Sequence, residues 1–338
     1  MSRLKTVALA LGFVGVSMAC KLLAWGGLSF LSEKSVVRST VAGVAALGLV
    51  VTMTVLAQRR RPSMHGRDLI LLPSLGLMSA RVAIGGLLGG ILIFTVVFAL
   101  VMATGGIAVR WRPVGLLDLA GTLVAVLVAT VLNAAWEEYT FRGWAFSACA
   151  KALGPHATAI GLGTTFGLAH LFNPNWTVAA IASVALAGFF LSYSMLASRN
   201  ILVPIGLHVG WNFTQSLLTS ARFWDLTRHA NPWRSGGEWG LEGSAAGIAI
   251  TAFGAAIALA AFLVPSRRVR LGHTPDAGSL DADAAASPPV SYGAAEEGGG
   301  GTRAGSDPVS SDPRSRTSSG HPVTARVHTS APTSRHSG

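Results

Sequence analysis

Two adjacent glutamates, Glu137 and Glu138, stand in a largely apolar stretch that ends at Arg142. Glu138 and Arg142 are spaced four residues apart with the acid first, the order that favours an ion pair on one face of a helix. Glu137 lies about 100° further round such a helix and is predicted to be left free. A free carboxylate in a water-poor site suits a general base at neutral pH. The alternative is that Arg142 neutralises both carboxylates at the end of a membrane span.

Two further pairs place a histidine one helical turn from another residue. Phe166 and His170 would share one helix face, and His208 and Asn212 would share another. The second pair suits an oxyanion site or a metal site, because the amide of Asn donates while histidine can give or accept a proton. The alternatives are a buried packing histidine and a hydrogen bond that only fastens two helices. Because polar groups inside apolar spans need partners, the three motifs together favour one shared cavity.

The elements that must position these residues are apolar runs. Hydrophobic residues make up 51% of the 338-residue chain and charged residues only 12%, whereas about a quarter of a soluble domain is charged. A run of about 20 apolar residues is long enough for a helix to cross a bilayer. The sequence therefore predicts an all-α, polytopic membrane bundle of about eight transmembrane helices. The expected spans are residues 6–31, 40–57, 82–103, 116–146, 156–172, 176–197, 201–218 and 244–264.

Local features refine this bundle. Lys21 interrupts the first span, which is still long enough to be a retained anchor and not a cleaved signal peptide. Gly154-Pro155 marks a turn between the fourth and fifth spans. Glu137 and His170 lie at similar distances before and after that turn, so an antiparallel helix pair would bring them to similar depth. No strand-like alternation stands out. The glycines expected to allow close helix approach are Gly85-Gly86, Gly89-Gly90 and Gly161 with Gly163.

Loop charges predict the orientation, because Lys and Arg are retained on the cytoplasmic side during insertion. The distribution favours both termini in the cytoplasm, and a composition rich in Ala, Gly and Arg suggests a bacterial-type plasma membrane. The basic residues on the side predicted to be cytoplasmic are Arg3, Lys5, Arg59, Arg60, Arg61, Arg67, Arg81, Lys151, Arg199, Arg267, Arg268 and Arg270. Residues 1–270 are predicted to form the bundle, and residues 271–338, rich in Gly, Ser, Ala and Pro, a disordered cytoplasmic tail.

Composition also argues against other classes of protein. The formal net charge is +11, but the cations are scattered at span ends beside lipid head groups, so nucleic acid is not an expected partner. The expected partners are the lipid bilayer and a membrane-associated protein or peptide. Cys20 and Cys149 have no CxxC spacing and indicate neither a redox site nor a metal site.

Taken in order, the three motifs resemble those of the CPBP family, the CAAX proteases and bacteriocin-processing enzymes also called the Abi family, and in particular the CAAX prenyl protease 2 type. The resemblance covers residues 116–218. It implies an intramembrane endopeptidase in which Glu137 and His170 activate the attacking water. His208 and Asn212 would then stabilise the oxyanion of the tetrahedral intermediate. The resemblance also implies that Glu138, Arg142 and Phe166 hold these four residues in place without acting on the substrate.

Zinc is the cofactor that the sequence leaves open. Members of the family have been described as metalloproteases, and Glu137, His170 and His208 form a set that zinc accepts with one position open for water. The HExxH helix, whose two histidines hold zinc together, is absent from this sequence. Ligand types therefore favour catalysis without a metal or with weak metal dependence.

Two functions from other classes remain alternatives. The first is a non-catalytic membrane scaffold or immunity-type protein in which the polar residues serve structure. The second is a proton-coupled transporter, for which intramembrane Glu and His residues would form a relay. The sequence shows no pair of corresponding interrupted spans of the kind that inverted repeats produce, which disfavours the transporter.

Overall fold

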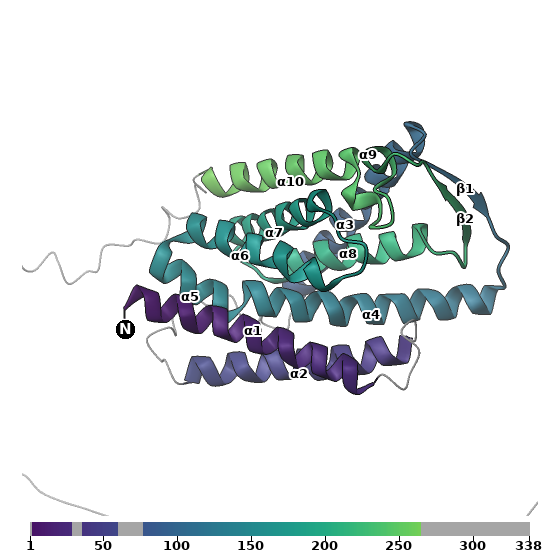
Figure 1. Cartoon of the computed structure of the whole chain (residues 1–338). Coiled ribbons are helices and arrows are strands. Elements are labelled where there is room, and N and C mark those ends of the chain that lie inside the picture. The colour runs from purple at the N-terminus through teal and green to yellow at the C-terminus, as the bar shows by residue number, and fades with distance from the viewer. Residues whose placement is uncertain (1, 29–35, 60–76, 265–338) are drawn as a thin grey trace, which may run out of the picture. The chain divides into compact units, whose positions relative to one another are not determined.

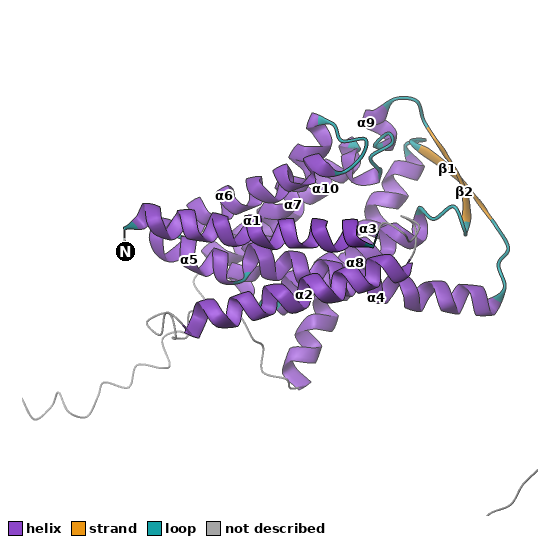
Figure 2. Cartoon of the chain, turned by 60° about the horizontal axis from the view of Figure 1, so that its bottom comes forward, coloured by secondary structure: helices purple, strands orange, loops and turns teal. Residues whose placement is uncertain are grey.

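A computed structural model describes residues 2–28, 36–59 and 77–264 of the chain, and these parts are almost entirely helical (Figures 1 and 2). The predicted tail, residues 271–338, lies outside the described residues. The same holds for Arg60, Arg61, Arg67, Arg267, Arg268 and Arg270, on which the predicted orientation partly depends. The helices are α1 (Arg3–Gly27), α2 (Val36–Arg59), α3 (Leu77–Ala103), α4 (Leu116–Arg142), α5 (Trp144–Leu153), α6 (Pro155–Ala169), α7 (Val178–Ser198), α8 (Leu202–Leu218), α9 (Pro232–Ser235) and α10 (Ala245–Leu263). Two single 3-10 turns, η2 (His170–Phe172) and η3 (Leu241–Gly243), complete the helical elements of this part of the chain.

The predicted all-α membrane fold is confirmed, although fewer helices have spanning length than expected. In the described part of the chain, six helical stretches are long and apolar enough to cross a membrane. They are Arg3–Gly27, Thr40–Ala57, Ser79–Ala103, Leu116–Leu153, Val178–Ser198 and Ala245–Leu263. The other two predicted spans correspond to α6 and α8, which have only 15 and 17 residues. A helix of that size lies below the roughly 20 residues that a full crossing needs.

The fourth predicted span ends earlier than the sequence suggested. We expected one helix over residues 116–146, but α4 stops at Arg142 and α5 begins at Trp144. Gly143 bends the backbone between them, with φ −79° and ψ −130°. A side chain at Gly143 would collide with the backbone of Tyr139. The α4 helix therefore ends directly after the Glu137, Glu138 and Arg142 motif.

Glycine-lined crossings hold the site-bearing helices together. Helices α3 and α8 cross where Gly86 and Gly90 face Gly206 and Gly210, and a Cβ on Gly86 would lie 2.7 Å from the carbonyl oxygen of Val203. The α6 and α7 helices approach in the same way at Gly163 and Gly188. Close backbone approach of this kind is a common way to associate membrane helices. The prediction is wrong for Gly85 and Gly161, which have open space beside them.

The N-terminal helices α1 and α2 run alongside each other, with α2 against α4 and α1 against α5 (Figure 1). The pair α7 and α10 packs together on the other side of the cavity described below. The buried core beneath α1 includes Phe13, Trp136 and Trp144. The hydroxyl of Ser17 accepts a hydrogen bond from Trp136 Nε1 at 3.1 Å and lies 2.8 Å from the Thr140 hydroxyl. These contacts fix α1 against α4.

A short β-ribbon was not expected from the sequence. Strands β1 (Ile107–Trp111) and β2 (Trp224–Arg228) pair antiparallel, with Ile107 opposite Arg228. The ribbon connects the loop after α3 to the loop after α8, as both views show (Figures 1 and 2). Its strands have only five residues each, too few for an alternating pattern to stand out in the sequence.

Candidate functional site

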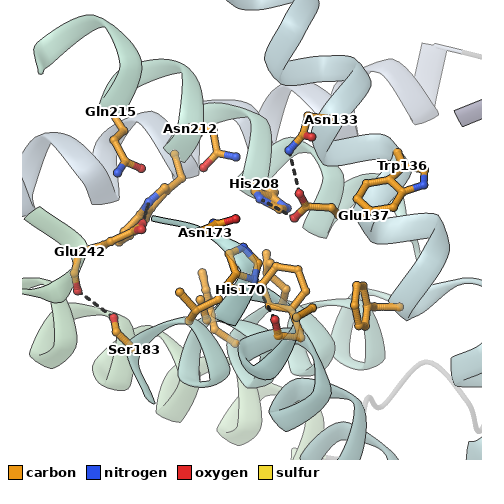
Figure 3. Close-up of a pocket in the computed structure, with 18 of the residues that line it drawn as sticks. Asn133, Trp136, Glu137, His170, Asn173, Ser183, His208, Asn212, Gln215 and Glu242 are labelled. Atoms are coloured by element: carbon orange, nitrogen blue, oxygen red, sulfur yellow. Dashed lines mark hydrogen bonds and ion pairs between the residues drawn. The ribbon is translucent and has the colours of Figure 1, made fainter. Parts of the chain in front are cut away.

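The polar residues of the three motifs meet at one cavity of about 810 Å³ between the helices. Four predicted site residues line it, namely Glu137, His170, His208 and Asn212. Phe166 lines it as well. Figure 3 shows Glu137, His208 and His170 pointing into the same space from α4, α8 and η2. The structure thus brings together the residues that the sequence singled out.

The carboxylate of Glu138 and the guanidinium of Arg142 form the buried floor behind this cavity. Both side chains are fully enclosed, and Arg142 Nη1 lies 3.2 Å from Glu138 Oε1. The predicted i,i+4 ion pair is confirmed. Arg142 also donates to the carbonyl oxygen of Gly188 at 2.9 Å and lies 4.5 Å from the centre of the Phe166 ring. A buried guanidinium needs such partners, because an unpaired charge in an apolar interior is strongly unfavourable.

His208 is oriented by this floor. Its Nδ1 donates to Glu138 Oε1 at 2.9 Å, because a carboxylate oxygen can only accept. The opposite ring nitrogen, Nε2, therefore faces the cavity and lies 3.7 Å from Oε2 of Glu137. That distance leaves room for one water molecule to contact both atoms. An imidazole whose second nitrogen is held by a carboxylate has a fixed orientation and a fixed tautomer when neutral.

Glu137 is not the free carboxylate that we predicted. Asn133, one turn earlier on α4, donates its amide Nδ2 to Oε1 at 2.8 Å. Lys21 of α1 lies 3.7 Å from the same oxygen. Arg142 pairs with Glu138 and forms no ion pair with Glu137 in the described structure, so the alternative of one arginine neutralising both acids is also wrong. The two carboxylate oxygens of Glu137 thus have different surroundings. Oε1 contacts Asn133 and Lys21, and Oε2 faces His208.

His170 reaches the cavity from the end of its helix. We expected it inside a membrane span over residues 156–172, but α6 ends at Ala169 and His170 begins the η2 turn. Its Nδ1 donates to the carbonyl oxygen of Phe166 at 2.8 Å, so Nε2 is the nitrogen available to a ligand. The Phe166 ring lies between the two histidines, 4.9 Å from the His170 ring and 6.1 Å from the His208 ring. The prediction that Phe166 and His170 share a face is confirmed.

The turn at Gly154-Pro155 is present, but it does not connect α4 to α6 directly. Gly154 adopts φ +85°, and Pro155 begins α6. Because α5 lies between α4 and this turn, Glu137 and His170 do not face each other across a simple antiparallel pair. They meet because both helix ends are directed at the cavity.

Asn212 lies one turn beyond His208 on α8, and both side chains line the cavity as predicted. Within the described residues, the amide of Asn212 makes no hydrogen bond, so its donors are available to a ligand. Figure 3 shows Asn212 and Gln215 along one side of the cavity and Glu242 beyond them. The α8 helix therefore presents a row of polar groups to whatever occupies the space.

The sequence interpretation missed several polar groups of the cavity. Lys21 was noted only as an interruption of the first span, and Asn133 was not considered. Glu242, in the η3 turn outside the spans, also lines the cavity and accepts a hydrogen bond from Trp211 Nε1 at 3.2 Å. Burial raises the pKa of the Glu242 carboxyl above its usual value, and this hydrogen bond partly opposes the shift. A polar residue inside an apolar run was the available indication for Lys21 and Asn133.

The residues proposed as zinc ligands do not form a ligand set in this arrangement. Among residues 2–28, 36–59 and 77–264, no three His, Cys, Asp or Glu side chains are placed to hold a metal ion together. The ammonium of Lys21 lies 3.7 Å from Glu137 Oε1, where it would repel a divalent cation. The donors present therefore do not fit zinc, and no step below depends on a metal.

Comparison with known proteins identifies the part of the chain that carries the motifs. Residues 119–214, less than a third of the 338-residue chain, match the family described as Type II CAAX prenyl endopeptidase Rce1-like. We call residues 119–214 the CAAX-protease segment, because they are similar to the type II CAAX prenyl endopeptidases. The family resemblance suggested by the three motifs is thereby confirmed for residues 119–214. No curated protein and no solved structure matches the chain.

The CAAX-protease segment supplies most, but not all, of the polar cavity lining. It includes the lining residues from Asn133 to Asn212, whereas Gln215 near the end of α8 lies just outside it. Lys21 on α1 and Glu242 in η3 lie outside it. Helix α1, which precedes the segment and contacts α4 and α5, thus contributes to the site as well as to the fold.

Proposed function

We propose that this chain is an intramembrane endopeptidase that hydrolyses a peptide bond of a membrane-associated substrate. The observation that carries the proposal is the facing pair of Glu137 Oε2 and His208 Nε2, 3.7 Å apart at the cavity wall. A carboxylate and an imidazole at that separation can act on the same water molecule or reacting carbonyl group. The similarity of the motif-bearing segment to the type II CAAX prenyl endopeptidases supports the same reaction class.

Water activation is assigned to Glu137 and His170. The Nε2 of His170 can accept one hydrogen bond from the water, because Nδ1 is occupied by the Phe166 carbonyl group. Glu137 takes the other proton through Oε2 as the water oxygen attacks the peptide carbonyl carbon. A positioned general base of this kind contributes about a hundredfold to ten-thousandfold in rate.

Oxyanion stabilisation is assigned to His208 and Asn212, which lie on one face of α8. When its Nε2 is protonated, His208 can donate to the negative oxygen of the tetrahedral intermediate, and Asn212 can donate through its amide. The intermediate collapses as the carbon–nitrogen bond breaks and Glu137 returns its proton to the leaving amine. Such donors act most strongly in a cavity shielded from bulk water.

The cavity walls support an apolar peptide segment as substrate. Around the polar groups, the lining is formed by large hydrophobic side chains such as Met18, Leu22, Trp25, Ile93 and Phe190. Since the matched family is described by prenyl endopeptidase activity, a C-terminal CAAX-type peptide is the first substrate class to test. A leader peptide of the bacteriocin type is the second.

The proposal is tested with the full chain purified in detergent and reconstituted in liposomes. Peptides of three kinds are offered, namely a prenylated CAAX peptide, the same peptide without the lipid, and a leader peptide, with cleavage followed by mass spectrometry. The native chain should cleave at least one of them at a single bond. Glu137→Gln should lower kcat by about a thousandfold or more. Asp118→Asn, an exposed carboxyl on the same helix, is the matched control and should keep the native rate.

Other outcomes would reject the proposal. If Glu137→Gln cleaved at the native rate, Glu137 would not be the base. Peptide binding without cleavage would favour the non-catalytic scaffold. Proton flux in liposomes that depends on Glu138 but not on His208 would favour the transporter.

A further inference from the structure

Lys21 is a cation in the middle of an apolar helix, and it reaches the site from outside the CAAX-protease segment. Its ammonium group donates to Oδ1 of Asn133 and lies 3.7 Å from Oε1 of Glu137. It also lies 3.7 Å from the centre of the Trp136 ring. The Lys21 side chain is only 23% exposed and lines the cavity. An ammonium group in such a place is unfavourable without partners, and all three partners belong to α4.

The charges of the site are divided into two pairs. Arg142 is the partner of Glu138, with 3.2 Å between their atoms, and lies behind the cavity. That leaves Lys21 as the only lysine or arginine within 4.0 Å of Glu137 among the described residues. The charge of Glu137 is therefore compensated by a residue that the family motifs do not contain.

The geometry around Glu137 shows what this pairing does. Oε1 receives the Asn133 amide at 2.8 Å and faces Lys21, whereas Oε2 faces Nε2 of His208 at 3.7 Å. Because Lys21 also binds the other end of the Asn133 amide, the three side chains form a closed set. Such a set fixes the rotation of the carboxylate and keeps Oε2 directed at the cavity.

From these contacts we infer that Lys21 is a positioning residue for hydrolysis, holding the Glu137 carboxylate through Oε1 so that Oε2 faces the attacking water. This inference rests on the proposed function of Glu137. It makes α1 a part of the active site, although α1 lies outside the matched segment. The competing explanation is that Lys21 only fastens α1 to α4, which the contacts of Ser17 with Trp136 and Thr140 already achieve.

Three substitutions of Lys21 separate charge, hydrogen bonding and packing. Lys21→Arg keeps the charge and the donors, Lys21→Gln keeps a donor without the charge, and Lys21→Met keeps only the length. Lys5→Met is the matched control, because Lys5 lies exposed on the same helix. For each reconstituted variant, kcat and KM are measured on the substrate of the native chain and normalised to the amount of folded protein.

Lys21→Arg should retain at least about a third of the native kcat, while Lys21→Gln and Lys21→Met should lose about tenfold or more, because a close charge in a water-poor site acts strongly. KM should change less than about twofold in all of them, since Lys21 acts through the Glu137 carboxylate and not on substrate binding. Lys5→Met should match the native chain. A native kcat in Lys21→Met, equal activity in the Gln and Arg variants, or a loss that only follows the amount of folded protein would overturn the inference.

A second measurement does not depend on activity. Thermal unfolding in detergent is compared for Lys21→Met, Glu137→Gln and the double variant. Each single change leaves one buried charge without its partner, whereas the double variant removes both charges. The Tm of the double variant should therefore fall by less than the sum of the two single decreases. Additive shifts would show that Lys21 does not hold Glu137. If the native chain cleaves no peptide, the proposed function fails, and this cycle still decides whether the two residues are coupled.

Discussion

The Nδ1 of His208 donates to Oε1 of Glu138 across 2.9 Å, and this single contact decides which ring nitrogen faces the cavity. Glu138 itself is fully buried and lies behind the cavity wall, where Arg142 shares the same oxygen. Glu137, its neighbour in sequence, faces the cavity instead. Two adjacent glutamates thus have different tasks, because successive residues of a helix point about 100° apart.

Loss of the orienting carboxylate should slow the reaction. In Glu138→Gln no carboxylate remains to accept from Nδ1 of His208, so the ring is held less firmly and its charged form, which donates to the oxyanion through Nε2, is less stable. We expect kcat per folded molecule to fall by about a hundredfold or more, by analogy with the loss of the orienting acid in a hydrolase triad. The measurement is steady-state cleavage in liposomes. An unchanged kcat would show that the ring is held without Glu138.

The buried guanidinium should matter for stability. Arg142→Gln removes the ion pair with Glu138 and the hydrogen bonds to Gly188 and Ser192, so the free energy of unfolding should fall by about 3 to 5 kcal/mol. Arg142→Lys should not restore it, because an ammonium group cannot reproduce the planar fork that contacts Glu138, Gly188 and Ser192. Denaturation in detergent provides the measurement. Arg81→Gln, an exposed site on α3, is the control, and an equal loss there would refute the argument.

The crossing of α3 and α8 offers a matched pair of glycines. A Cβ on Gly86 would lie 2.7 Å from the Val203 carbonyl oxygen, whereas Gly85 has nothing within 4 Å. Gly86→Ala should therefore displace α8 with its site residues, lowering both Tm and kcat. Gly85→Ala should keep the native kcat and raise stability by about 0.5 to 1 kcal/mol, since alanine favours the helix. Thermal unfolding and cleavage assays on both variants test this, and equal effects at the two positions would contradict it.

Asn212 is expected to act on the transition state only. Asn212→Asp preserves the shape of the side chain but removes the amide donor and adds a negative charge beside the developing oxyanion. We expect kcat to fall by about a hundredfold to a thousandfold, with KM nearly unchanged. Asn212→Leu should show a similar loss of kcat. A selective rise in KM would instead assign Asn212 to substrate binding.

The site chemistry proposed here does not require a metal. Prolonged treatment with a strong chelator should leave kcat within about twofold of the untreated protein, whereas removal of a catalytic zinc abolishes hydrolysis. The assay compares chelator-treated protein with protein to which zinc is added back. If the chelator abolished activity and added zinc restored it, Glu137, His170 and His208 would again be candidate zinc ligands. The Lys21 ammonium group would then have to lie further from Glu137 than it does here.

Much of the site followed from residue spacing. The i,i+4 pairs Glu138 with Arg142 and His208 with Asn212 were placed on common helix faces correctly, because helix geometry fixes such neighbours without reference to the rest of the fold. The positions at which the helices end were harder to predict from the sequence. The bend at Gly143 and the end of α6 at Ala169 depend on packing against other elements, which a single stretch of sequence does not contain.

The sequence by itself determined the membrane-helical class and four of the polar residues that line the cavity, since apolar run length and helical periodicity are local properties. Its three motifs also indicated the family that the central segment matches. Only the tertiary structure decided the environment of each group. It brought Lys21 of α1 to Glu137 and His208 of α8 to Glu138, and it placed Glu242 of η3 at the cavity. These partnerships join residues from different elements. Such contacts depend on how the bundle packs, which the spacing of residues along the chain does not predict.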